Sequence, residues 1–364
     1  MSGSNLEAIR RQIDEVDEKL TELLEKRMSL VSRVAEYKKS TSTEILDTAR
    51  EEKVLLNVLR KVGNPEYADT IMSIFRDIMH HSKEYQQKII GAGNKAVAKK
   101  YALIGEKLGH SLSPQIHSAF FAKLGISADY DLVEVAPGEL PFVLENLKTR
   151  GYLGINVTIP YKTEIMKYLD EISREALKIG AVNTIRFNPV FKGYNTDYAG
   201  FGMSLNYYGV KINGKRAAVL GSGGSARAVI TYLADNEAGS ITVVSRNADA
   251  ARQKYPELQS VNIGEFKASG YDLVINCTPV GMYPKTGLSP LEKEQLEGAG
   301  FVMDLIYNPE TTKLLEYAAE LGIPCANGLY MLIAQAICAQ EIWQEISVDA
   351  EIINEIYKGM KDEN

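Results

Sequence analysis

The apolar residues of the first ninety positions recur at steps of three and four, the spacing that places side chains on one face of an α-helix. From Leu6 to Leu23 the steps are 3, 4, 3, 4 and 3. The same stretch holds only two glycines and one proline, which favours long helices. Breaks in the pattern predict three helices, at about residues 5–39, 47–62 and 66–89.

Beyond Tyr101 the pattern changes to short apolar and β-branched runs that alternate with helical stretches. Eight runs predict strands: YALIG (101–105), DYDLVEV (129–135), INVTI (155–159), NTIRF (183–187), RAAVLG (216–221), ITVVS (241–245), DLVINC (272–277) and FVMDLI (301–306). This alternation predicts an α/β architecture with largely parallel sheets. Residues 91–100 are small and basic without an aromatic residue, which predicts a linker, and residues 329–360 again show a helical pattern.

Composition and charge narrow the class of protein. The 364 residues predict two or three domains, and 45% apolar with 24% charged residues is ordinary for globular domains. A net charge of −6 argues against non-specific nucleic-acid binding, which needs a basic surface. Three widely spaced cysteines form no disulfide framework, and four histidines show no metal-ligand spacing, so we expect no bound metal. Without an apolar run of ~18 residues or a signal-peptide-like start, we expect a cytoplasmic protein with no membrane-spanning segment.

One charged residue interrupts the apolar stripe of the first predicted helix. Arg27 occupies the position that continues the series between Leu23 and Leu30. An arginine buried there without partners would be strongly disfavoured, although taken alone it could also reach solvent or specify helix register. Lys38 follows 11 residues later, which at ~100° per residue is close to the same face and ~16 Å further along the axis.

More polar residues gather on the other two predicted helices. Asp47, Arg50 and Glu51 share a face near the start of the second helix because their spacing is i, i+3, i+4. On the third helix Ser82 extends the apolar stripe and Gln86 follows four residues later. Each residue alone suits a solvated face or a helix cap. Together with the two cations of the first helix, they predict a polar pocket inside a helical bundle that suits a small polyanion.

Eight polar positions spread over the first ninety residues carry a family resemblance: Arg10, Arg27, Lys38, Asp47, Arg50, Glu51, Ser82 and Gln86. At these positions the chain resembles the all-helical chorismate mutases, with a small length shift before the third helix. The resemblance implies a homodimer in which the long first helices are shared, so that Arg10 enters the partner's pocket. Helix geometry agrees with this arrangement. The 17 residues from Arg10 to Arg27 correspond to a rotation of roughly −100° about the helix axis, so the two side chains lie on different faces of the helix.

The rearrangement of chorismate to prephenate needs neither a nucleophile nor an obligatory proton transfer. The site must hold a dicarboxylate in a reactive shape and stabilise charge on the breaking ether bond. By resemblance, Arg27, Lys38 and Gln86 are the catalytic residues. The resemblance implies that the carboxylates meet Arg10, Arg27, Arg50 and Ser82, the ether oxygen meets Lys38 and Gln86, and the ring hydroxyl meets Asp47 and Glu51.

A glycine-rich motif follows the strand predicted at 216–221. Gly221, Gly223 and Ala226 have the G-x-G-x-x-A spacing that opens a helix and lets a diphosphate approach its N-terminus. The next strand ends at Arg246, where an NAD site would place an acidic residue; the arginine suits the 2′-phosphate of NADP or is an exposed loop charge. We predict NADP as the cofactor, held by Gly221, Ser222, Gly223, Gly224, Ser225, Ala226, Ser245, Arg246, Asn247, Thr278, Leu305 and Gly328.

Six motifs that contain Ser, Thr, Asn or Asp lie at predicted strand ends or turns: HSLSP (110–114), INVTIPYK (155–162), AVNT (181–184), GYNTD (193–197), VINCTPVGM (274–282) and DLIYNPETT (304–312). A seventh motif, GLYMLIAQA (328–336), begins the C-terminal helical stretch. Singly they could cap helices or close turns. In this order and spacing they resemble the shikimate dehydrogenases, over about residues 101–362. The resemblance implies an α/β substrate domain at 101–203, completed by helices of 326–364, and a Rossmann NADP-binding domain at 204–325.

Lys162 and Asp197 are the catalytic pair that this resemblance implies. Hydride leaves the substrate carbon as its hydroxyl proton is removed, and a lysine beside a carboxylate can shuttle that proton, with the immediate base left open. The implied shikimate contacts are Ser111 and Ser113 at the carboxylate, Thr158, Asn183 and Gln335 at the hydroxyls, and Tyr307 facing the substrate. Two positions depart from the family: Ser245-Arg246-Asn247 replaces the usual Asn-Arg-Thr or Asn-Arg-Ser, which bears on NADP preference, and Tyr330 replaces a common glycine.

The sequence therefore predicts a multidomain chain, with an all-α mutase-like domain at 1–90, a linker at 91–100 and an α/β dehydrogenase in the remainder. We expect chorismate-to-prephenate rearrangement and reduction of 3-dehydroshikimate to shikimate with NADPH. Two alternatives stay open: the helical domain could be a non-catalytic dimerisation or regulatory module, and the dehydrogenase could act on quinate with NAD. Coupling or feedback between the two sites also stays open.

Overall fold

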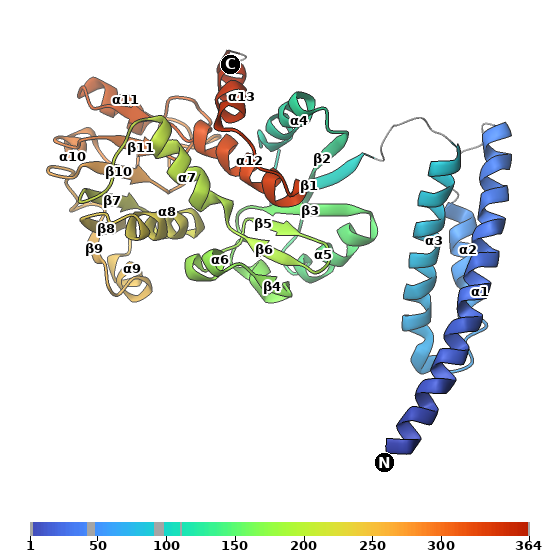
Figure 1. Cartoon of the computed structure of the whole chain (residues 1–364). Coiled ribbons are helices and arrows are strands. Elements are labelled where there is room, and N and C mark those ends of the chain that lie inside the picture. Colours follow the sequence, from blue (N-terminus) through green and yellow to red (C-terminus); the bar gives the residue numbers. More distant parts are fainter. Residues whose placement is uncertain (1–2, 42–47, 91–97, 110, 363–364) are drawn as a thin grey trace. The chain divides into compact units, whose positions relative to one another are not determined.

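The computed structural model describes residues 3–41, 48–90, 98–109 and 111–362. The chain divides into two compact units, Met1–Ala96 and Val97–Asn364, which are described in turn (Figure 1). Within the described ranges, no helix has both the length and the apolar character needed to cross a membrane.

Apart from the turn at residues 60–64, the described residues of the first unit are helical. Its helices are α1 (Gly3–Thr41), α2 (Thr48–Leu59) and α3 (Ala68–Ile90), with a short 3-10 helix, η1 (Pro65–Tyr67), before α3. The three helices predicted from the apolar pattern are confirmed. α2 ends three residues earlier than predicted because the chain turns before η1, where Asn64 caps the new helix by accepting a hydrogen bond from the Glu66 amide at 3.0 Å.

The apolar stripe of α1 is only partly covered within one chain. α1 and α2 both pack on α3, and Ala35 and Met79 are buried there. Eight apolar residues of α1 are 46–64% exposed: Leu6, Ile9, Ile13, Val16, Leu20, Leu23, Leu30 and Val34. A long apolar surface is therefore available to a partner.

The second unit begins with a six-stranded mixed sheet in the order β2-β1-β3-β5-β6-β4. Its strands are β1 (Lys99–Gly105), β2 (Ala128–Glu134), β3 (Tyr152–Val157), β4 (Glu171–Ile172), β5 (Thr184–Arg186) and β6 (Lys192–Tyr194). Along β1, Tyr101 and Leu103 pack on the side of α4 (Ser113–Leu124), while Ala102 and Ile104 pack on the side of α5 (Leu140–Thr149). Because both faces of β1 are buried, the strand reads as a continuous apolar run.

A second six-stranded sheet is entirely parallel, in the order β12-β11-β10-β7-β8-β9. Its strands are β7 (Arg216–Leu220), β8 (Ser240–Ser245), β9 (Gln259–Asn262), β10 (Leu273–Asn276), β11 (Val302–Asp304) and β12 (Cys325–Ala326). The helices of this part are α8 (Gly224–Asp235), α9 (Ala248–Lys254), α10 (Lys293–Leu296) and α11 (Lys313–Glu320). The chain moves outward from β7 to β9 and returns to β10 on the other side of β7. Ligands of such sheets bind at the carboxyl ends of the strands where the order reverses.

All eight predicted strand runs contain a strand, and parallel pairs predominate as expected. The pattern missed β4, β6, β9 and β12, which have two to four residues each. They lie outside the longer apolar and β-branched runs that marked β5 and β11, which have only three residues each.

Two helices run side by side between the sheets, α7 (Thr196–Tyr207) and α12 (Leu329–Gln344) (Figure 1). α7 carries the chain toward the second sheet and crosses the boundary predicted at 203/204, while α12 carries it back. On α12, Trp343 donates a hydrogen bond to the Ile185 carbonyl at 2.9 Å and stacks on Tyr101 with ring centroids 4.7 Å apart. The last helix, α13 (Ala350–Asp362), packs on α12 and α4, and the two remaining short helices are η2 (Glu164–Tyr168) and α6 (Arg174–Ile179).

Candidate functional site

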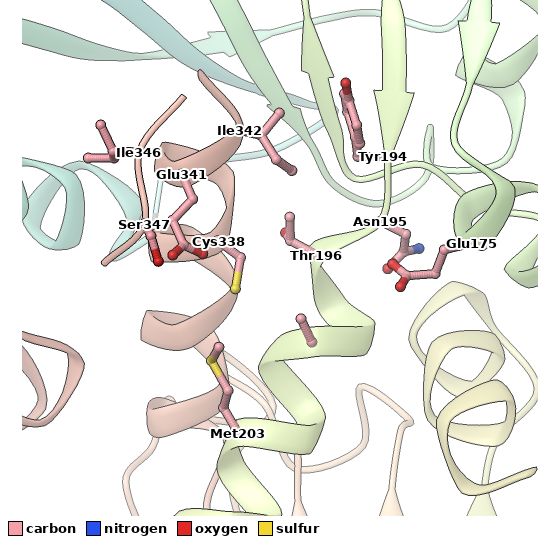
Figure 2. A pocket seen from close by; sticks show the side chains of 11 residues that line it. Glu175, Tyr194, Asn195, Thr196, Met203, Cys338, Glu341, Ile342, Ile346 and Ser347 are labelled. Carbon is pink, nitrogen blue, oxygen red and sulfur yellow. The ribbon is translucent and has the colours of Figure 1, made fainter. Parts of the chain in front are cut away.

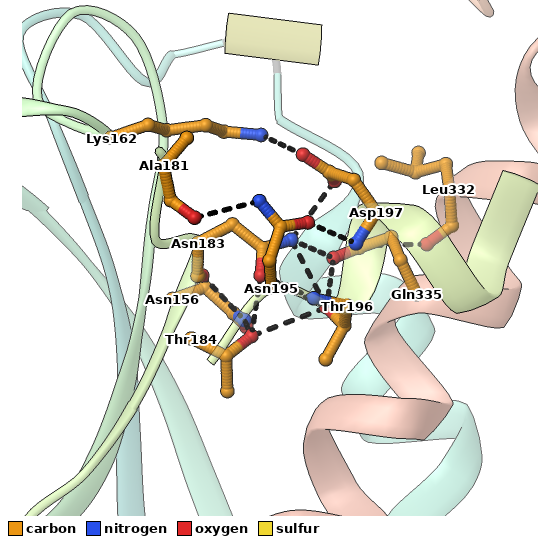
Figure 3. A network of polar contacts seen from close by, with 10 residues as sticks. All are labelled: Asn156, Lys162, Ala181, Asn183, Thr184, Asn195, Thr196, Asp197, Leu332 and Gln335. Atoms are coloured by element: carbon orange, nitrogen blue, oxygen red, sulfur yellow. Dashed lines mark hydrogen bonds and ion pairs between the residues drawn. The ribbon is translucent and has the colours of Figure 1, made fainter. Parts of the chain in front are cut away.

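Lys162 and Asp197 form an ion pair in the second unit (Figure 3). Lys162 Nζ lies 2.6 Å from Asp197 Oδ2, and the two side chains are only 13% and 8% exposed. Lys162 lies in the loop after β3, and its carbonyl accepts a hydrogen bond from the Val182 amide at 2.7 Å. Asp197 lies in the first turn of α7, where the N-cap residue Asn195 accepts a hydrogen bond from its amide at 3.1 Å. Two motifs 35 residues apart thus meet at one pair of opposite charges.

Asn183, a predicted substrate ligand, is the centre of the hydrogen bonds around Asp197 (Figure 3). Its Nδ2 donates to Asp197 Oδ1 at 2.9 Å and to Thr196 Oγ1 at 3.0 Å, and Gln335 Oε1 of α12 lies 3.4 Å away. Its Oδ1 accepts a hydrogen bond from the Thr196 amide at 2.7 Å. With both ends of the amide engaged, Asn183 fixes the orientation of the Asp197 carboxylate.

A second layer of buried polar residues lies behind Asn183, and the sequence analysis missed it. Asn156 Nδ2 donates to the Asn183 carbonyl at 3.2 Å and to Thr184 Oγ1 at 3.0 Å. Tyr130 donates to Asn156 Oδ1 at 2.7 Å, and burial raises the pKa of Tyr130 well above its ordinary value, so the phenol remains a donor. A lone asparagine inside the apolar run INVTI was the available signal, because a buried amide needs partners.

The predicted carboxylate-binding serines connect to the same network. The Ser113 amide donates to Ser111 Oγ at 3.2 Å, and the two hydroxyl oxygens lie 3.1 Å apart. Ser113 opens α4 and is 7% exposed, and its side chain lowers the pKa of Tyr130 against the larger effect of burial. In the part of the chain that the structure describes, no hydrogen bond joins Thr158 or Tyr307 to this network. Burial raises the pKa of the Tyr307 hydroxyl. The structure thus brings together Ser111, Ser113, Lys162, Asn183, Asp197 and Gln335.

The glycine-rich loop between β7 and α8 has the geometry of a phosphate-binding turn. Gly221 has φ of +101°, which L side chains rarely adopt, and a Cβ there would lie 2.9 Å from Thr278 Cγ2. Gly223 is the N-cap of α8 and supplies no side chain to cap it. The first amides of α8 can therefore meet an anion, and Ala226 is fully buried where the helix packs on the sheet. These residues fit the diphosphate of a dinucleotide.

The predicted 2′-phosphate loop follows β8. Arg246 is exposed, and its carbonyl accepts a hydrogen bond from Asn262 Nδ2 at 3.2 Å. Asn247 caps α9 by accepting a hydrogen bond from the Ala250 amide at 3.0 Å, and its own amide donates to Ser245 Oγ at 3.3 Å. Ser245 and Asn247 thus build the turn that presents Arg246.

A buried carboxylate supports the other cofactor loops, and the sequence analysis did not identify it. Asp304, at the end of β11, accepts hydrogen bonds from Thr312 Oγ1 at 2.6 Å, Asn276 Nδ2 at 2.9 Å and the Ile306 amide at 3.0 Å. Asn276 Oδ1 in turn accepts hydrogen bonds from the amide and hydroxyl of Thr278, at 2.9 and 2.7 Å. Burial raises the pKa of Asp304 to about 6, although the three hydrogen bonds lower it.

The ion pair of Lys162 and Asp197 and the predicted cofactor loops are adjacent. A Cβ at Gly224 would lie 3.7 Å from Lys162 Cδ, so the lysine stem passes the start of α8. Gly328 lies so close to the loop after β11 that a Cβ would be 2.0 Å from the Leu305 carbonyl oxygen. A dinucleotide on α8 would therefore reach the neighbourhood of Lys162 and Asp197.

In the helical unit, Arg27, Ser82 and Gln86 come together between α1 and α3. Arg27 donates a hydrogen bond to Ser82 Oγ, and burial lowers the pKa of Arg27. Ser82 is 3% exposed and donates to the Ile78 carbonyl at 2.5 Å, and Gln86 Nε2 donates to the Ser82 carbonyl at 3.4 Å. Gln86 Oε1 is buried and has no hydrogen-bond partner among the described residues. A partly buried arginine and a partly buried glutamine side by side suit an anionic ligand.

The remaining predicted mutase residues are spread along α1 and α2. Arg10 is exposed near the start of α1, Lys38 is half-buried near its end, and Arg50 is exposed at the start of α2. Asp47 and the side chain of Glu51 lie outside the described residues.

A separate cavity of about 470 Å³ lies beside α7 and α12 (Figure 2). Its lining includes Asn195 and Thr196, which also support Asp197 and Asn183, together with Glu175, Glu341 and Cys338. Burial raises the pKa of Cys338 to about 12, so its thiol stays protonated. None of the predicted site residues lines this cavity. Across the described ranges, no group of three or more His, Cys, Asp or Glu residues is arranged to hold a metal ion.

Comparison with protein families identifies both parts of the chain. Residues 9–87 match the model of chorismate mutase type II, and residues 103–185 match that of the shikimate dehydrogenase substrate binding domain. The NADP(+)-dependent shikimate dehydrogenase of Clostridium beijerinckii is 43% identical over 266 residues, which cover 72% of this chain and 98% of that protein.

Two solved structures show the same architecture. A chorismate mutase/shikimate 5-dehydrogenase fusion protein from Clostridium acetobutylicum is 47% identical, with a TM-score of 0.70 over 73% of this chain and 98% of the solved chain. Shikimate 5-dehydrogenase from Thermus thermophilus, solved with NADP(H) and shikimate, is 31% identical, with a TM-score of 0.65 over 71% of this chain and 98% of that chain.

Proposed function

This chain belongs to the shikimate dehydrogenase family and carries a chorismate mutase type II domain at its N-terminus, and on that premise we propose how its two sites act. It combines a chorismate mutase with an NADP-dependent shikimate dehydrogenase. We propose that the helical unit converts chorismate to prephenate and that the second unit reduces 3-dehydroshikimate to shikimate. The observation that carries the dehydrogenase mechanism is the ion pair of Lys162 and Asp197 beside Gly224.

Reduction turns the substrate carbonyl oxygen into a hydroxyl, so one proton must arrive as hydride adds to carbon. NADPH supplies the hydride when it is bound over α8. Lys162 Nζ carries the proton and is held by Asp197 at 2.6 Å, and the proton passes from this pair to the substrate oxygen. In the reverse direction the same pair takes up the hydroxyl proton. Asn183 keeps the Asp197 carboxylate turned toward Lys162.

The other predicted ligands then hold the substrate around this pair. We propose that Ser111 and Ser113 bind its carboxylate, while Thr158, Asn183 and Gln335 bind its hydroxyls and Tyr307 faces its ring. Two hydrogen bonds support this assignment, from Tyr130 to Asn156 and from Asn156 to the Asn183 carbonyl, together with the effect of Ser113 on the pKa of Tyr130. A rigid path between the carboxylate end and the reacting end favours one orientation of the substrate.

In the mutase site, Arg27 and Gln86 would meet the dianionic substrate directly. Arg27 is partly buried and donates one hydrogen bond to Ser82, so a substrate carboxylate would accept hydrogen bonds from its remaining N–H groups. By the family pattern Lys38 and Gln86 stabilise the ether oxygen, Arg50 binds a carboxylate, and Asp47 and Glu51 bind the hydroxyl. The site therefore works by clamping and charge stabilisation, without acid–base catalysis.

We propose that two copies of the chain pair through α1. Eight exposed apolar residues form a stripe along this helix, and Arg10 diverges from Arg27 by roughly −100° around the helix axis. An apolar stripe of this length matches a second copy of itself, and pairing would bring Arg10 to the partner's pocket.

Light scattering tests this pairing. We expect the native chain to have twice its 40.3 kDa mass, and Leu20→Asp to be monomeric and to lose mutase activity while retaining dehydrogenase activity. Arg11→Asp is the matched control, since nine residues place it ~180° from Leu20. A monomeric native chain with full mutase activity would contradict the proposal.

Steady-state kinetics tests the proposed reactions. We expect kcat/KM to be highest for shikimate with NADP when shikimate, quinate, NADP and NAD are compared in all combinations. A preference for quinate with NAD would overturn this assignment.

For the helical unit we expect chorismate mutase activity that Arg27→Ala abolishes and that the exposed-site control Arg33→Ala retains. Absence of this activity in the native chain would assign the unit a dimerisation or regulatory role.

A further inference from the structure

Two cationic side chains outside the predicted cofactor set belong to the helices next to the glycine-rich loop: Lys254 of α9 and Arg227 of α8. Lys254, the last residue of α9, donates a hydrogen bond from Nζ to the carbonyl oxygen of Ser222 in that loop. Arg227 lies in the first turns of α8 and approaches the Ile179 carbonyl at 3.5 Å. Burial lowers the pKa of Lys254, and the charge of Arg227 lowers it further.

Neither cation has a protein counter-charge in the described part of the chain. No carboxylate oxygen there lies within 4.0 Å of Lys254 or Arg227, whereas Arg252 on the same helix α9 pairs with Asp249 at 3.1 Å. The Tyr255 hydroxyl is buried and has no hydrogen-bond partner among the described residues. The charge of Arg227 lowers the pKa of this hydroxyl, whereas burial raises it. Two like charges beside an unpartnered hydroxyl are stabilised when an anion binds between them.

The start of α8 lies at the same place. Gly223 leaves the first turn of this helix without a side-chain cap, so its amides and the Lys254 ammonium adjoin one place where an anionic group can bind. We propose that Lys254 and Arg227 bind the diphosphate of the dinucleotide over residues 221–224. This proposal rests on the proposed NADP-dependent function and adds two ligands to it.

The position of Lys254 favours the diphosphate over the 2′-phosphate. Its hydrogen bond is to Ser222, in the turn after β7 where a diphosphate binds, whereas the 2′-phosphate site is expected at Arg246 after β8. A lysine ammonium has three donors, and Ser222 occupies one of them. The remaining two are available to phosphate oxygens.

The experiment must separate a charge effect from simple support of the loop. Lys254→Gln keeps a donor for the Ser222 carbonyl but removes the charge. Arg227→Gln likewise removes the charge and keeps an amide donor, here for the Ile179 carbonyl. Arg252→Gln is the control on α9. Equilibrium dissociation constants for NADPH and NADH are measured by nucleotide fluorescence, and Trp343 fluorescence verifies that each variant is folded.

We expect each Gln variant to weaken both nucleotides by about tenfold, with a shallower salt dependence, while Lys254→Arg and Arg252→Gln bind as the native chain does. Native affinity in the folded Gln variants would assign Lys254 and Arg227 to loop support and overturn the proposal. A loss confined to NADPH would place the cations at the 2′-phosphate and would also overturn it. Nucleotide binding without turnover in the native enzyme would instead contradict the proposed reaction and leave this site intact.

Discussion

Asp304 offers a direct test of how burial acts on the framework of the cofactor loops. It is fully buried at the end of β11, and its three hydrogen bonds connect β10, the loop after β11 and the start of α11. Burial raises its pKa from 3.8 to about 6. The substitution Asp304→Asn keeps the shape of the side chain and removes its charge.

The direction in which stability changes with pH follows from proton binding. Because the pKa of Asp304 is higher in the folded protein than in the unfolded chain, the folded state binds the proton more tightly. The resulting stabilisation is complete below pH 3.8 and is lost as the pH rises through about 6. At ~1.4 kcal/mol per pH unit the whole difference is ~3 kcal/mol, of which ~2 kcal/mol falls between about pH 4 and 7.

Urea unfolding followed by tryptophan fluorescence measures this contribution. The chain has one tryptophan, Trp343, which lies on α12 and reports only the dehydrogenase unit. We expect the free energy of unfolding of the native chain, relative to Asp304→Asn, to fall by ~2 kcal/mol from about pH 4 to pH 7. Asp249→Asn, at a carboxylate with an 84% exposed side chain, controls for the loss of one charge. A difference that is independent of pH would refute the reasoning.

Three further predictions concern the active site and its support. Lys162→Met should lower the dehydrogenase kcat by ~10²–10⁴-fold and leave mutase activity unchanged, as measured by steady-state assays of both reactions; a loss below tenfold would contradict the proton-transfer role. Tyr130→Phe leaves Asn156 Oδ1 without its donor and should lower the free energy of urea unfolding by ~1–3 kcal/mol, whereas an unchanged value would show that the bond contributes nothing. Gly154→Ala would place a Cβ 2.2 Å from Trp343 Nε1 and should destabilise the dehydrogenase by ~1–3 kcal/mol in the same assay, while Gly209→Ala, a glycine with φ of +69° and open space around it, separates backbone strain from this clash.

The apolar pattern predicted the long helices because they extend over enough residues to show their period. It also predicted the buried strands, including β5 and β11 with three residues each, because these lie in longer apolar and β-branched runs. It misjudged the end of α2, where the Asn64 cap begins a new helix, and it missed β9, which has four residues. In both cases a local hydrogen bond or a short strand pairing decided the structure. Neither feature produces a repeating spacing of apolar residues in the sequence.

The residues of the candidate site likewise fall into those that the sequence predicted and those that it missed. Lys162 and Asp197 were predicted because their motifs resemble those of a known family, and the structure pairs them. Asn156 and Asp304 were missed, since each lies in an otherwise apolar strand and acts through residues it contacts only after folding. Lys254 was missed for a related reason: as the last residue of a helix it resembles any surface lysine, and only the packing of α9 places it on Ser222.

The sequence by itself therefore determined the order of the elements, the two kinds of unit and the chemistry of the main ligands, because periodicity, glycine spacing and motifs are local properties of the chain. The tertiary structure decided which polar groups share a site: Lys162 and Asp197 are 35 residues apart, and Asn183 and Gln335 are 152 apart. Burial then decided how those groups behave, since the pKa of Asp304 depends on the desolvation of its carboxylate rather than on its neighbours in sequence. Desolvation and hydrogen-bond partnership arise from the packing of distant segments, and so they appear only in the folded chain.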